Sequence, residues 1–295
     1  SSDTTAAVPS ANLTAARYGP AATGNSTHGY FGGGNPTTSR MDKVTYSSDT
    51  TAAVPSANLT AARYLLAATG NSTHGYFGGG RTPSITSLMD KVTYSSDTTN
   101  AVPSANLSLA RYSLAATGNS DAGYFGGGRT FPGPYSTMEK VTYSSDTTAA
   151  VPGANLTVAR QSLAATGNST HGYFGGGNPT TSRMDRVTYS SDTTAAVPGA
   201  NLSAARLGLA ATGNSTHGYF GGGSPTTSLM DKVTYSSDTT AAVPGANLTV
   251  ARRDLAASSA RANGLPDEIL FPAPSSPATR FSDGAGPSPN TGYFG

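Results

Sequence analysis

The sequence contains no cysteine and no tryptophan among its 295 residues. Without cysteine, disulfide bonds, thiolate metal sites and a cysteine nucleophile are all excluded. Charged residues make up only 12% of the chain, the formal net charge is +2, and no block of like charge occurs. Nucleic acids are usually bound through such blocks, so we expect no nucleic-acid partner. The longest apolar run, residues 64–68, is far shorter than the roughly 20 residues that cross a bilayer, so we expect no membrane insertion.

Large aliphatic side chains are scarce as well. Val, Leu, Ile and Phe together make up about 14% of the chain, below the level expected of a compact core. The near-zero net charge nevertheless argues against a disordered chain. The 15 tyrosines and the many alanines can supply buried surface where backbones pack closely. We therefore expect an ordered protein in which small side chains dominate the packing.

One eleven-residue phrase, GNSTHGYFGGG at residues 24–34, recurs without change at 70–80, 167–177 and 213–223. A variant, GNSDAGYFGGG, stands at 118–128. A second phrase, SSDTT, begins at Ser1, Ser47, Ser95, Ser144, Ser190 and Ser236. These starts lie 46 to 49 residues apart, and repeats of this period indicate a solenoid or a propeller.

The differences in period arise in one segment, between the glycines and the next methionine. Its five copies are residues 35–40, 81–88, 129–137, 178–183 and 224–229. Length variation confined to one place indicates a surface loop, often on the binding face. The second and third copies differ most, so a partner that breaks the symmetry is expected to contact Arg81, Ile85, Arg129, Phe131 and Tyr135.

Each unit shows the pattern of four short strands. In one unit these strands are expected at residues 64–70, 76–80, 89–94 and 100–102, and Pro103 ends the last of them. Segments rich in Ser, Asn and Asp, which favour turns, separate the strands. No strongly periodic helical pattern is present. Four short strands in a unit of this length are typical of a β-propeller blade.

The order of residues within a unit resembles the kelch repeat: an arginine, an apolar strand, an aromatic strand ending in glycines, a loop, a strand ending in tyrosine, and a final strand. The kelch-like arginines, taken as structural residues of the blades, are Arg17, Arg63, Arg111, Arg160, Arg206 and Arg252. The glycines are Gly32–Gly34, Gly78–Gly80, Gly126–Gly128, Gly175–Gly177 and Gly221–Gly223. The tyrosines are Tyr46, Tyr94, Tyr143, Tyr189 and Tyr235. One departure is that Ala-Val, as at Ala53–Val54, replaces the tryptophan usual on the outer strand. The phrase GYFGGG also resembles repeats of marine microbial, phage and algal-virus surface proteins.

Five full blades can be counted between Arg17 and Val243, with an outer strand left over near residues 6–8 and inner strands left over near the C-terminus. We therefore predict an all-β fold: a six-bladed kelch-like β-propeller with four short antiparallel strands per blade and a seam blade shared between the N- and C-termini. In this division, residues 1–257 are the propeller repeats and residues 258–291 are a Pro/Ser/Gly-rich excursion or linker. Residues 292–295 begin a further GYFGGG strand that can close the ring. Both ends fall inside repeated phrases, so we expect a piece of a longer protein.

The repeated chemistry argues against an enzyme, because catalysis needs one asymmetric arrangement of groups. Ser26, His28 and the aspartates could compose a hydrolase site, but nothing distinguishes one copy from the next. The triple glycine is not followed by a helix or a suitably spaced lysine, as a phosphate-binding loop requires. We predict no catalytic residue and no cofactor.

The four histidines occupy the same turn of their units, at His28, His74, His171 and His217. A symmetric ring would hold them too far apart for one ion, and the third unit carries Asp121–Ala122 instead, so we predict no metal site.

The acidic residues of the third strand, Asp42, Asp90, Glu139, Asp185 and Asp231, could form a cation-binding ring, but we favour ion pairs with the repeat arginines. The SSDTT aspartates are expected to cap tight turns.

The strongest chemical signal is the acceptor pattern N-x-[ST] for N-linked glycans, which would indicate a secreted protein. It occurs at Asn12, Asn25, Asn58, Asn71, Asn106, Asn155, Asn168, Asn201, Asn214 and Asn247. Because repetition multiplied two original motifs, the ten sites are two independent observations, and in a bacterial or viral protein the pattern carries no such meaning.

The leading hypothesis is a non-enzymatic structural or adhesive protein, extracellular or at a cell or virion surface, that serves as a propeller building block of a fibre, filament or appendage. Its expected partners are copies of itself or adjacent propellers of the same longer chain, because near-identical units favour multivalent contacts. The alternative is a lectin-like or receptor-binding propeller, for example of a viral tail fibre, with glycans bound between blades by Tyr and Asn. A third hypothesis is an intracellular kelch-type adaptor.

Overall fold

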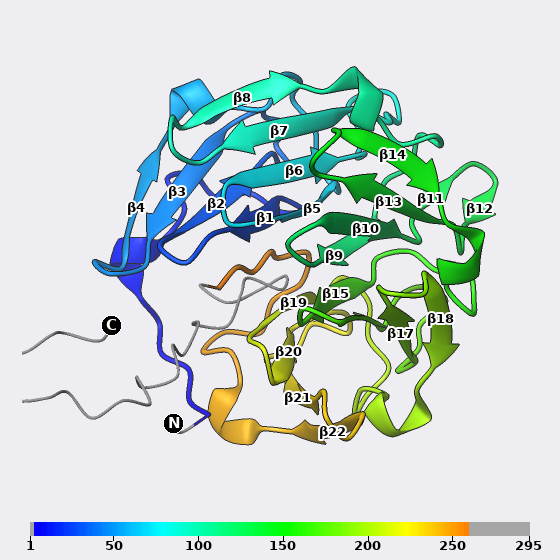
Figure 1. The fold of residues 1–295 in the computed structure, drawn as a ribbon. Coiled ribbons are helices and arrows are strands. Elements are labelled where there is room, and N and C mark those ends of the chain that lie inside the picture. Colours follow the sequence, from blue (N-terminus) through cyan, green and yellow to red (C-terminus); the bar gives the residue numbers. More distant parts are fainter. Residues whose placement is uncertain (1–2, 260–295) are drawn as a thin grey trace, which may run out of the picture.

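The structure, a computed structural model, describes residues 3–259. These residues form five four-stranded antiparallel sheets, the blades, arranged around a common axis as in a β-propeller (Figure 1). Each blade fills from the axis outward in chain order, and the first strands of successive blades contact one another. The prediction of a repeated propeller with four antiparallel strands per blade is confirmed.

The strands repeat with almost unchanged length. Blade 1 contains β1 (Ala21–Gly24), β2 (His28–Gly32), β3 (Met41–Thr45) and β4 (Thr50–Ala53). Blade 2 contains β5 (Ala67–Gly70), β6 (His74–Gly78), β7 (Met89–Thr93) and β8 (Thr98–Ala101). Blade 3 contains β9 (Ala115–Gly118), β10 (Ala122–Gly126), β13 (Met138–Thr142) and β14 (Thr147–Ala150), and its variable loop adds a hairpin of β11 (Arg129–Thr130) and β12 (Gly133–Pro134). Blade 4 contains β15 (Ala164–Gly167), β16 (His171–Gly175), β17 (Met184–Thr188) and β18 (Thr193–Ala196). Blade 5 contains β19 (Ala210–Gly213), β20 (His217–Gly221), β21 (Met230–Thr234) and β22 (Thr239–Ala242).

A one-turn 3₁₀ helix follows the outer strand of each blade, where a proline stops the strand, and an equivalent helix near the N-terminus follows no strand of residues 3–259. These helices are η1 (Pro9–Ala11), η2 (Pro55–Ala57), η3 (Pro103–Ala105), η4 (Pro152–Ala154), η5 (Pro198–Ala200) and η6 (Pro244–Ala246). Within residues 3–259, no helix has the length and apolar character needed to cross a membrane.

The turn between the first two strands of a blade is closed by its asparagine. In blade 2 the Asn71 side-chain oxygen accepts hydrogen bonds from the backbone N–H groups of Thr73 and His74, both at 2.9 Å. Gly70 begins this turn, and a Cβ atom there would lie 2.2 Å from the carbonyl oxygen of His74. The phrase G-N-S-T-H thus encodes a tight hairpin through one close backbone approach and one side-chain acceptor.

The hydrophobic core lies between blades rather than within them. In the cluster that joins blades 2 and 3, Tyr76 and Met89 pack with Phe125, Val141 and Tyr143, and all are 7% exposed or less. Equivalent clusters join blades 1 and 2, blades 3 and 4, and blades 4 and 5. A blade on its own therefore leaves its apolar faces in water, which explains why the chain repeats the unit.

Buried ion pairs fix each connecting segment to the blade that follows it. Arg63 Nη2 contacts the Asp90 carboxylate at 3.0 Å, and Arg111 Nη2 contacts Glu139 at 2.8 Å, with all four side chains fully buried. The arginine backbone also bonds to the preceding blade, since the Gly34 N–H donates to the Arg63 carbonyl oxygen at 3.0 Å. Burial lowers the pKa of Arg63 while the Asp90 carboxylate opposes that shift. The third-strand carboxylates are thus paired with arginine.

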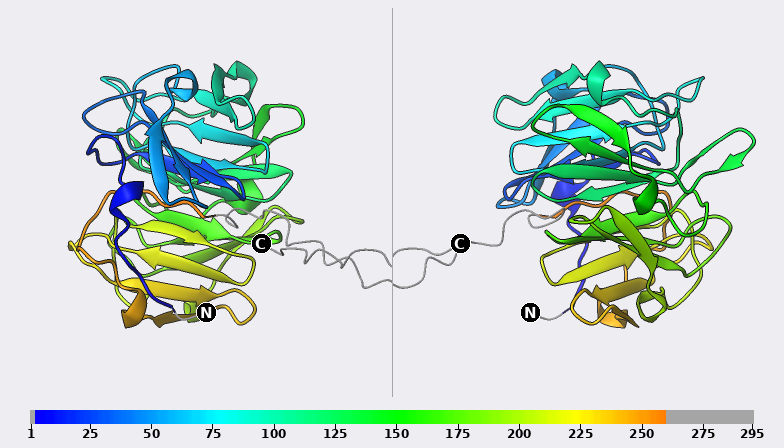
Figure 2. Two further views of the ribbon diagram at one scale, coloured as in Figure 1. Left: turned by 90° about the vertical axis from the view of Figure 1, so that its left-hand side faces the viewer. Right: turned by 45° about the vertical axis from the view of Figure 1, so that its right-hand side comes forward.

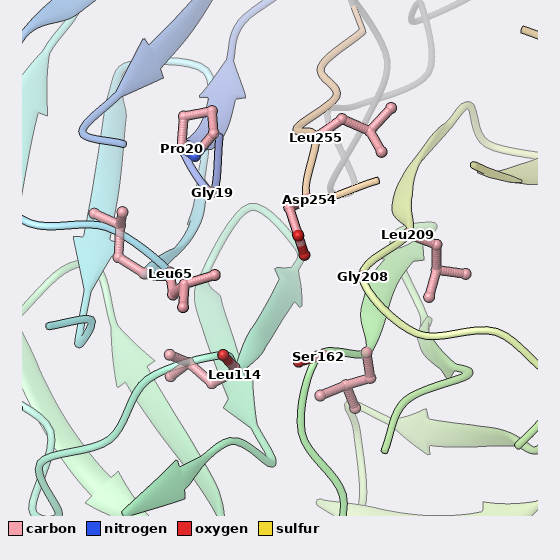
Figure 3. A pocket seen from close by; sticks show the side chains of 12 residues that line it. Gly19, Pro20, Leu65, Leu114, Ser162, Gly208, Leu209, Asp254 and Leu255 are labelled. Atoms are coloured by element: carbon pink, nitrogen blue, oxygen red, sulfur yellow. The ribbon is translucent and has the colours of Figure 1, made fainter. Parts of the chain in front are cut away.

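A closed ring of six backbone hydrogen bonds surrounds one end of the axis. Six residues take part, and the N–H of each donates to the carbonyl oxygen of the one before it at 2.7 or 2.8 Å. In chain order they are Gly19, Leu65, Ser113, Ser162, Gly208 and Asp254, and Asp254 is the acceptor for Gly19. All six have positive φ, between 53° and 64°. Figure 3 shows this hub ring around a small pocket that Leu114, Leu209 and Leu255 also line. The hub therefore has six positions.

The predicted count of six blades is wrong for the described part of the chain, which forms five. Of the described residues, two segments lie at the sixth position, one at the axis and one at the rim. Residues 254–259 lie at the axis, where Ser258 Oγ is 2.8 Å from the Tyr46 hydroxyl. At the rim, Asp3 Oδ1 accepts the Tyr219 hydroxyl at 2.6 Å, and Thr5 donates to the Ala246 carbonyl oxygen at 2.7 Å.

Between these two segments, residues 3–259 supply no second or third strand, so no sheet forms there. Residues 254–259, at the axis, likewise pair with no strand of the described chain. The predicted strand at residues 292–295 and most of the predicted linker at 258–291 lie outside the described residues.

Candidate functional site

The propeller has two different ends, which we name by the segments that form them. The loop face carries the hub ring and the variable loops between the second and third strands. The turn face carries the turns between the first and second strands and between the third and fourth strands. Figure 2 shows the blades from two sides, with the β11–β12 hairpin standing out from the body.

On the loop face, arginines and tyrosines of the first three blades form a row. The Arg81 guanidinium lies 5.6 Å from the Tyr64 ring centre and 5.1 Å from that of Tyr112. Arg129 lies 5.8 Å from the same Tyr112 ring, and Tyr18 packs edge-on against Tyr64 at 6.3 Å. We call these five residues the Arg/Tyr row. Such cation–π contacts hold long side chains in a fixed arrangement on a surface.

The Arg/Tyr row ends at blade 3, which makes the loop face asymmetric. Gln161 and Leu207 stand in blades 4 and 5 where the earlier blades carry tyrosine. They pair with Asn178 and Ser224, whereas the tyrosines of blades 2 and 3 pair with arginine. Phe131, at the tip of the β11–β12 hairpin, is 87% exposed. The structure thus places Arg81 and Arg129 together in the row.

The other predicted contact residues lie in the same two loops. Ile85 forms a bridge with Arg81, and the Tyr135 N–H donates to the Gly128 carbonyl oxygen. Both side chains are half-buried.

The turn face carries the four histidines. Each ring is half-buried, with Nδ1 at 2.8 Å from the hydroxyl of the preceding threonine. Desolvation lowers the pKa of His74, and the nearby Lys91 lowers it further. In residues 3–259, no group of three or more His, Asp or Glu side chains is placed to hold a metal ion.

Both kinds of glycosylation motif also have a structural use. In the turn motif, Thr27 Oγ1 donates to the Asn25 side-chain oxygen at 2.9 Å. In the A-N-L-T motif, the Asn58 side-chain oxygen accepts the Met41 N–H at 2.8 Å, and Thr60 donates to the Asp90 carboxylate at 2.6 Å. The same asparagine contact to the third strand recurs at Asn106, Asn155, Asn201 and Asn247. The spacing N-x-[ST] therefore follows from packing whether or not a sugar is attached.

A cavity of about 500 Å³ opens on the turn face between blades 3 and 4. Asn119, Asp121 and Lys140 line it from blade 3, and His171 and Tyr189 line it from blade 4. Ala122 also lines it, at the position where the other four blades carry histidine. The substitution of Thr-His by Asp121–Ala122 thus removes a ring from this cavity and adds a carboxylate.

A polar network that sequence reasoning missed joins neighbouring blades at the turn face. The SSDTT aspartates of the five blades have positive φ, near 50°, as a tight turn requires. Except for Asp49, the SSDTT aspartates also bond through their side chains to a neighbouring blade. Asp97 Oδ1 accepts the Tyr30 hydroxyl at 2.5 Å and Asp97 Oδ2 pairs with Lys43. The same pattern occurs at Asp146, Asp192, Asp238 and Asp3. The only sequence signal for this network is that tyrosine, lysine or arginine, and aspartate recur once per repeat.

This network makes stability depend on pH. Partial burial alone would raise the pKa of Asp146, but hydrogen bonds from Lys91 and Tyr76 outweigh it and lower that pKa below its ordinary value. A lowered folded-state pKa adds stability above the unfolded-state value, and this stability is lost as pH falls through the folded-state pKa. We expect Asp146→Asn to cost about 1 kcal/mol of unfolding free energy at pH 7 and less at pH 3. Urea denaturation at both pH values measures this, and an equal cost at both would contradict it.

Comparison with known proteins adds no identification: no family model matches the chain, and no curated protein shows significant similarity to it.

Proposed function

We propose that this protein is a non-enzymatic, kelch-like propeller building block of an extracellular fibre, filament or surface appendage, whose loop face contacts further copies or adjacent propellers of the same longer chain. The observation that carries the proposal is the asymmetric loop face. Four interblade interfaces are nearly identical, yet the Arg/Tyr row and the exposed Phe131 distinguish blades 1 to 3. An ordered cationic and aromatic surface beside an exposed apolar tip is suited to contact with another protein.

Self-association of the purified chain tests this role. Sedimentation velocity and negative-stain electron microscopy should show concentration-dependent oligomers, and Phe131→Ser together with Arg81→Ser should abolish them. A control is Val250→Ser, which removes another exposed apolar side chain from the connection after blade 5. A chain that stays monomeric at high concentration, or oligomers insensitive to the loop substitutions, would argue against the proposal.

The cavity between blades 3 and 4 favours a second candidate function, the binding of a glycan. An asparagine and two charged side chains can donate and accept hydrogen bonds to sugar hydroxyls, and the half-buried His171 ring can stack on a sugar. This candidate predicts one binding site per chain, because the other turns carry histidine where Ala122 stands.

Substitutions can fill this cavity or create an equivalent cavity between blades 2 and 3. We expect Ala122→His to weaken binding of any sugar selected on a glycan array by at least about tenfold, equivalent to about 1.4 kcal/mol. Conversely, Thr73→Asp with His74→Ala reproduces the third-unit sequence in blade 2 and should raise the calorimetric stoichiometry from one site to two. Binding that survives Ala122→His would place the sugar elsewhere.

A further inference from the structure

We infer that the sixth position of the hub is a docking site for one β-hairpin with the repeat's own sequence, G-Y-F-G-G-G, a loop and M-[DE]-[KR]-V-T-Y, supplied by a repeat other than the five that form the blades of residues 3–259. This inference deepens the proposed building-block role, and rests on it for its use in assembly. The site lies between blade 5 and blade 1, with its two flanks already occupied by residues 254–259 and by the N-terminal segment.

The side of blade 5 that faces the sixth position lacks the contacts that the other blades receive. In blades 1 to 4, a threonine of the first strand lies 3.5 Å from a tyrosine hydroxyl of the next blade; examples are Thr23 with Tyr94 and Thr166 with Tyr235. The equivalent Thr212 Oγ1 is buried without a hydrogen-bond partner among residues 3–259. Met230 is partly exposed, although its four counterparts are 1% exposed or less.

The side of blade 1 shows the complementary deficit. Phe77, Phe125, Phe174 and Phe220 are fully buried against the preceding blade, but Phe31 is partly exposed. Val44 is partly exposed as well, whereas Val92, Val141, Val187 and Val233 are fully buried. Tyr46 and Tyr219, on opposite sides of the sixth position, each lack the stacked tyrosine that joins the other neighbouring blades in residues 3–259.

Two charged side chains beside the sixth position, Asp49 and Arg252, indicate the sequence of the hairpin that would bind there. Asp49 forms no side-chain hydrogen bond or ion pair with residues 3–259, although its five counterparts each accept a tyrosine hydroxyl and pair with Lys or Arg. Arg252 is exposed and has no carboxylate partner in the described chain, whereas its five counterparts are paired. A hairpin with the repeat sequence brings tyrosine and lysine to Asp49, aspartate to Arg252 and a terminal tyrosine to Thr212.

The third strand for the sixth position is none of the five copies within residues 3–259. The sequence M-[DE]-[KR]-V-T-Y occurs five times in the chain, and each copy already forms the third strand of a blade. Pairing of an added strand with open sheet edges is a common mode of recognition, in which the backbone supplies affinity and alternate side chains supply specificity.

A peptide with the sequence of residues 28–46 tests the inference on the full chain. Labelled with fluorescein, it should bind with saturable 1:1 stoichiometry by fluorescence anisotropy, and unlabelled peptide should raise the melting temperature. Replacing both peptide tyrosines by phenylalanine keeps the rings but removes the hydroxyls meant for Asp49 and Thr212. We expect this change to weaken binding about tenfold.

A charge exchange gives the sharper result. Asp49→Lys should prevent binding of the parent peptide, and a Lys43→Asp peptide should bind this variant but not the parent chain. Ser144→Lys, which adds a positive charge to the exposed corresponding turn of blade 3, serves as a control that leaves affinity unchanged. Absence of saturable binding, or binding indifferent to both charge reversals, would overturn the docking site. Hairpin binding without self-association would instead remove the building-block role and leave the docking site intact.

Discussion

Replacement of Phe125 by alanine is expected to lower the free energy of unfolding by about 3–5 kcal/mol, whereas the same change at Phe31 should cost about 1 kcal/mol. Phe125 is fully buried between blades 2 and 3, where its ring lies against Gly78. Deleting it leaves a cavity that the rigid sheets cannot fill. Phe31 occupies the same place in its repeat but lies partly exposed beside the sixth position.

The two phenylalanines form a matched pair, because the surrounding phrase G-Y-F-G-G-G is identical in both blades. Equilibrium denaturation in urea, followed by circular dichroism, measures both costs. Phe174→Ala should behave like Phe125→Ala. Equal costs at Phe31 and Phe125 would mean that blade 1 is covered as fully as the others, and would contradict the open sixth position.

The second large effect is expected at the buried ion pairs. Arg63→Met should cost about 3–5 kcal/mol, because it leaves the fully buried Asp90 carboxylate without its cation. Arg252→Met, the equivalent change in the last repeat, should lie within about 0.5 kcal/mol of the parent, because that side chain is exposed.

A double substitution separates charge from packing. Arg63→Met with Asp90→Leu replaces the pair by apolar side chains of similar size and should recover most of the lost stability. The comparison uses the melting temperature and the urea midpoint of the parent, Arg63→Met, Arg252→Met and the double variant. If the double variant is as unstable as Arg63→Met alone, the arginine acts mainly through its bond to the Phe77 carbonyl oxygen, which the structure also contains.

The repeat period and the strand pattern were enough to predict the propeller and its blades. Both follow from local signals: alternation around Val92, the turn-forming Asn71, and Pro103 at the end of an outer strand. Pairing of the arginines with the third-strand carboxylates could also be anticipated, because a charge that recurs once per unit needs a partner that recurs equally often.

The interactions between blades could not be predicted in the same way. Asp97 and its partner Tyr30 are 67 residues apart in the sequence. The sequence indicates that the aspartate forms a turn, but not that its side chain also bonds to the neighbouring blade. The blade count failed for a related reason. The segments left over at the two ends resemble the outer and inner strands of a blade in sequence. A blade also needs the two strands between them, and residues 3–259 contain no such strands for a sixth blade.

The hub ring gave no sequence signal at all. Its positions are filled by Gly, Leu, Ser and Asp, and they share only a left-handed backbone conformation imposed by closure. Neither the cavity between blades 3 and 4 nor the Arg/Tyr row follows from the repeat as such, since both arise where single units depart from it.

The closed ring of backbone hydrogen bonds that includes Gly19 and Asp254 also limits how many repeats one propeller can contain. Each member donates once and accepts once, so the circle admits a fixed number of participants and no more. Duplication of another repeat could not widen it by one place without breaking it. A protein with more repeats would therefore fold into successive propellers. Such a protein would grow by whole propeller domains rather than by single repeats.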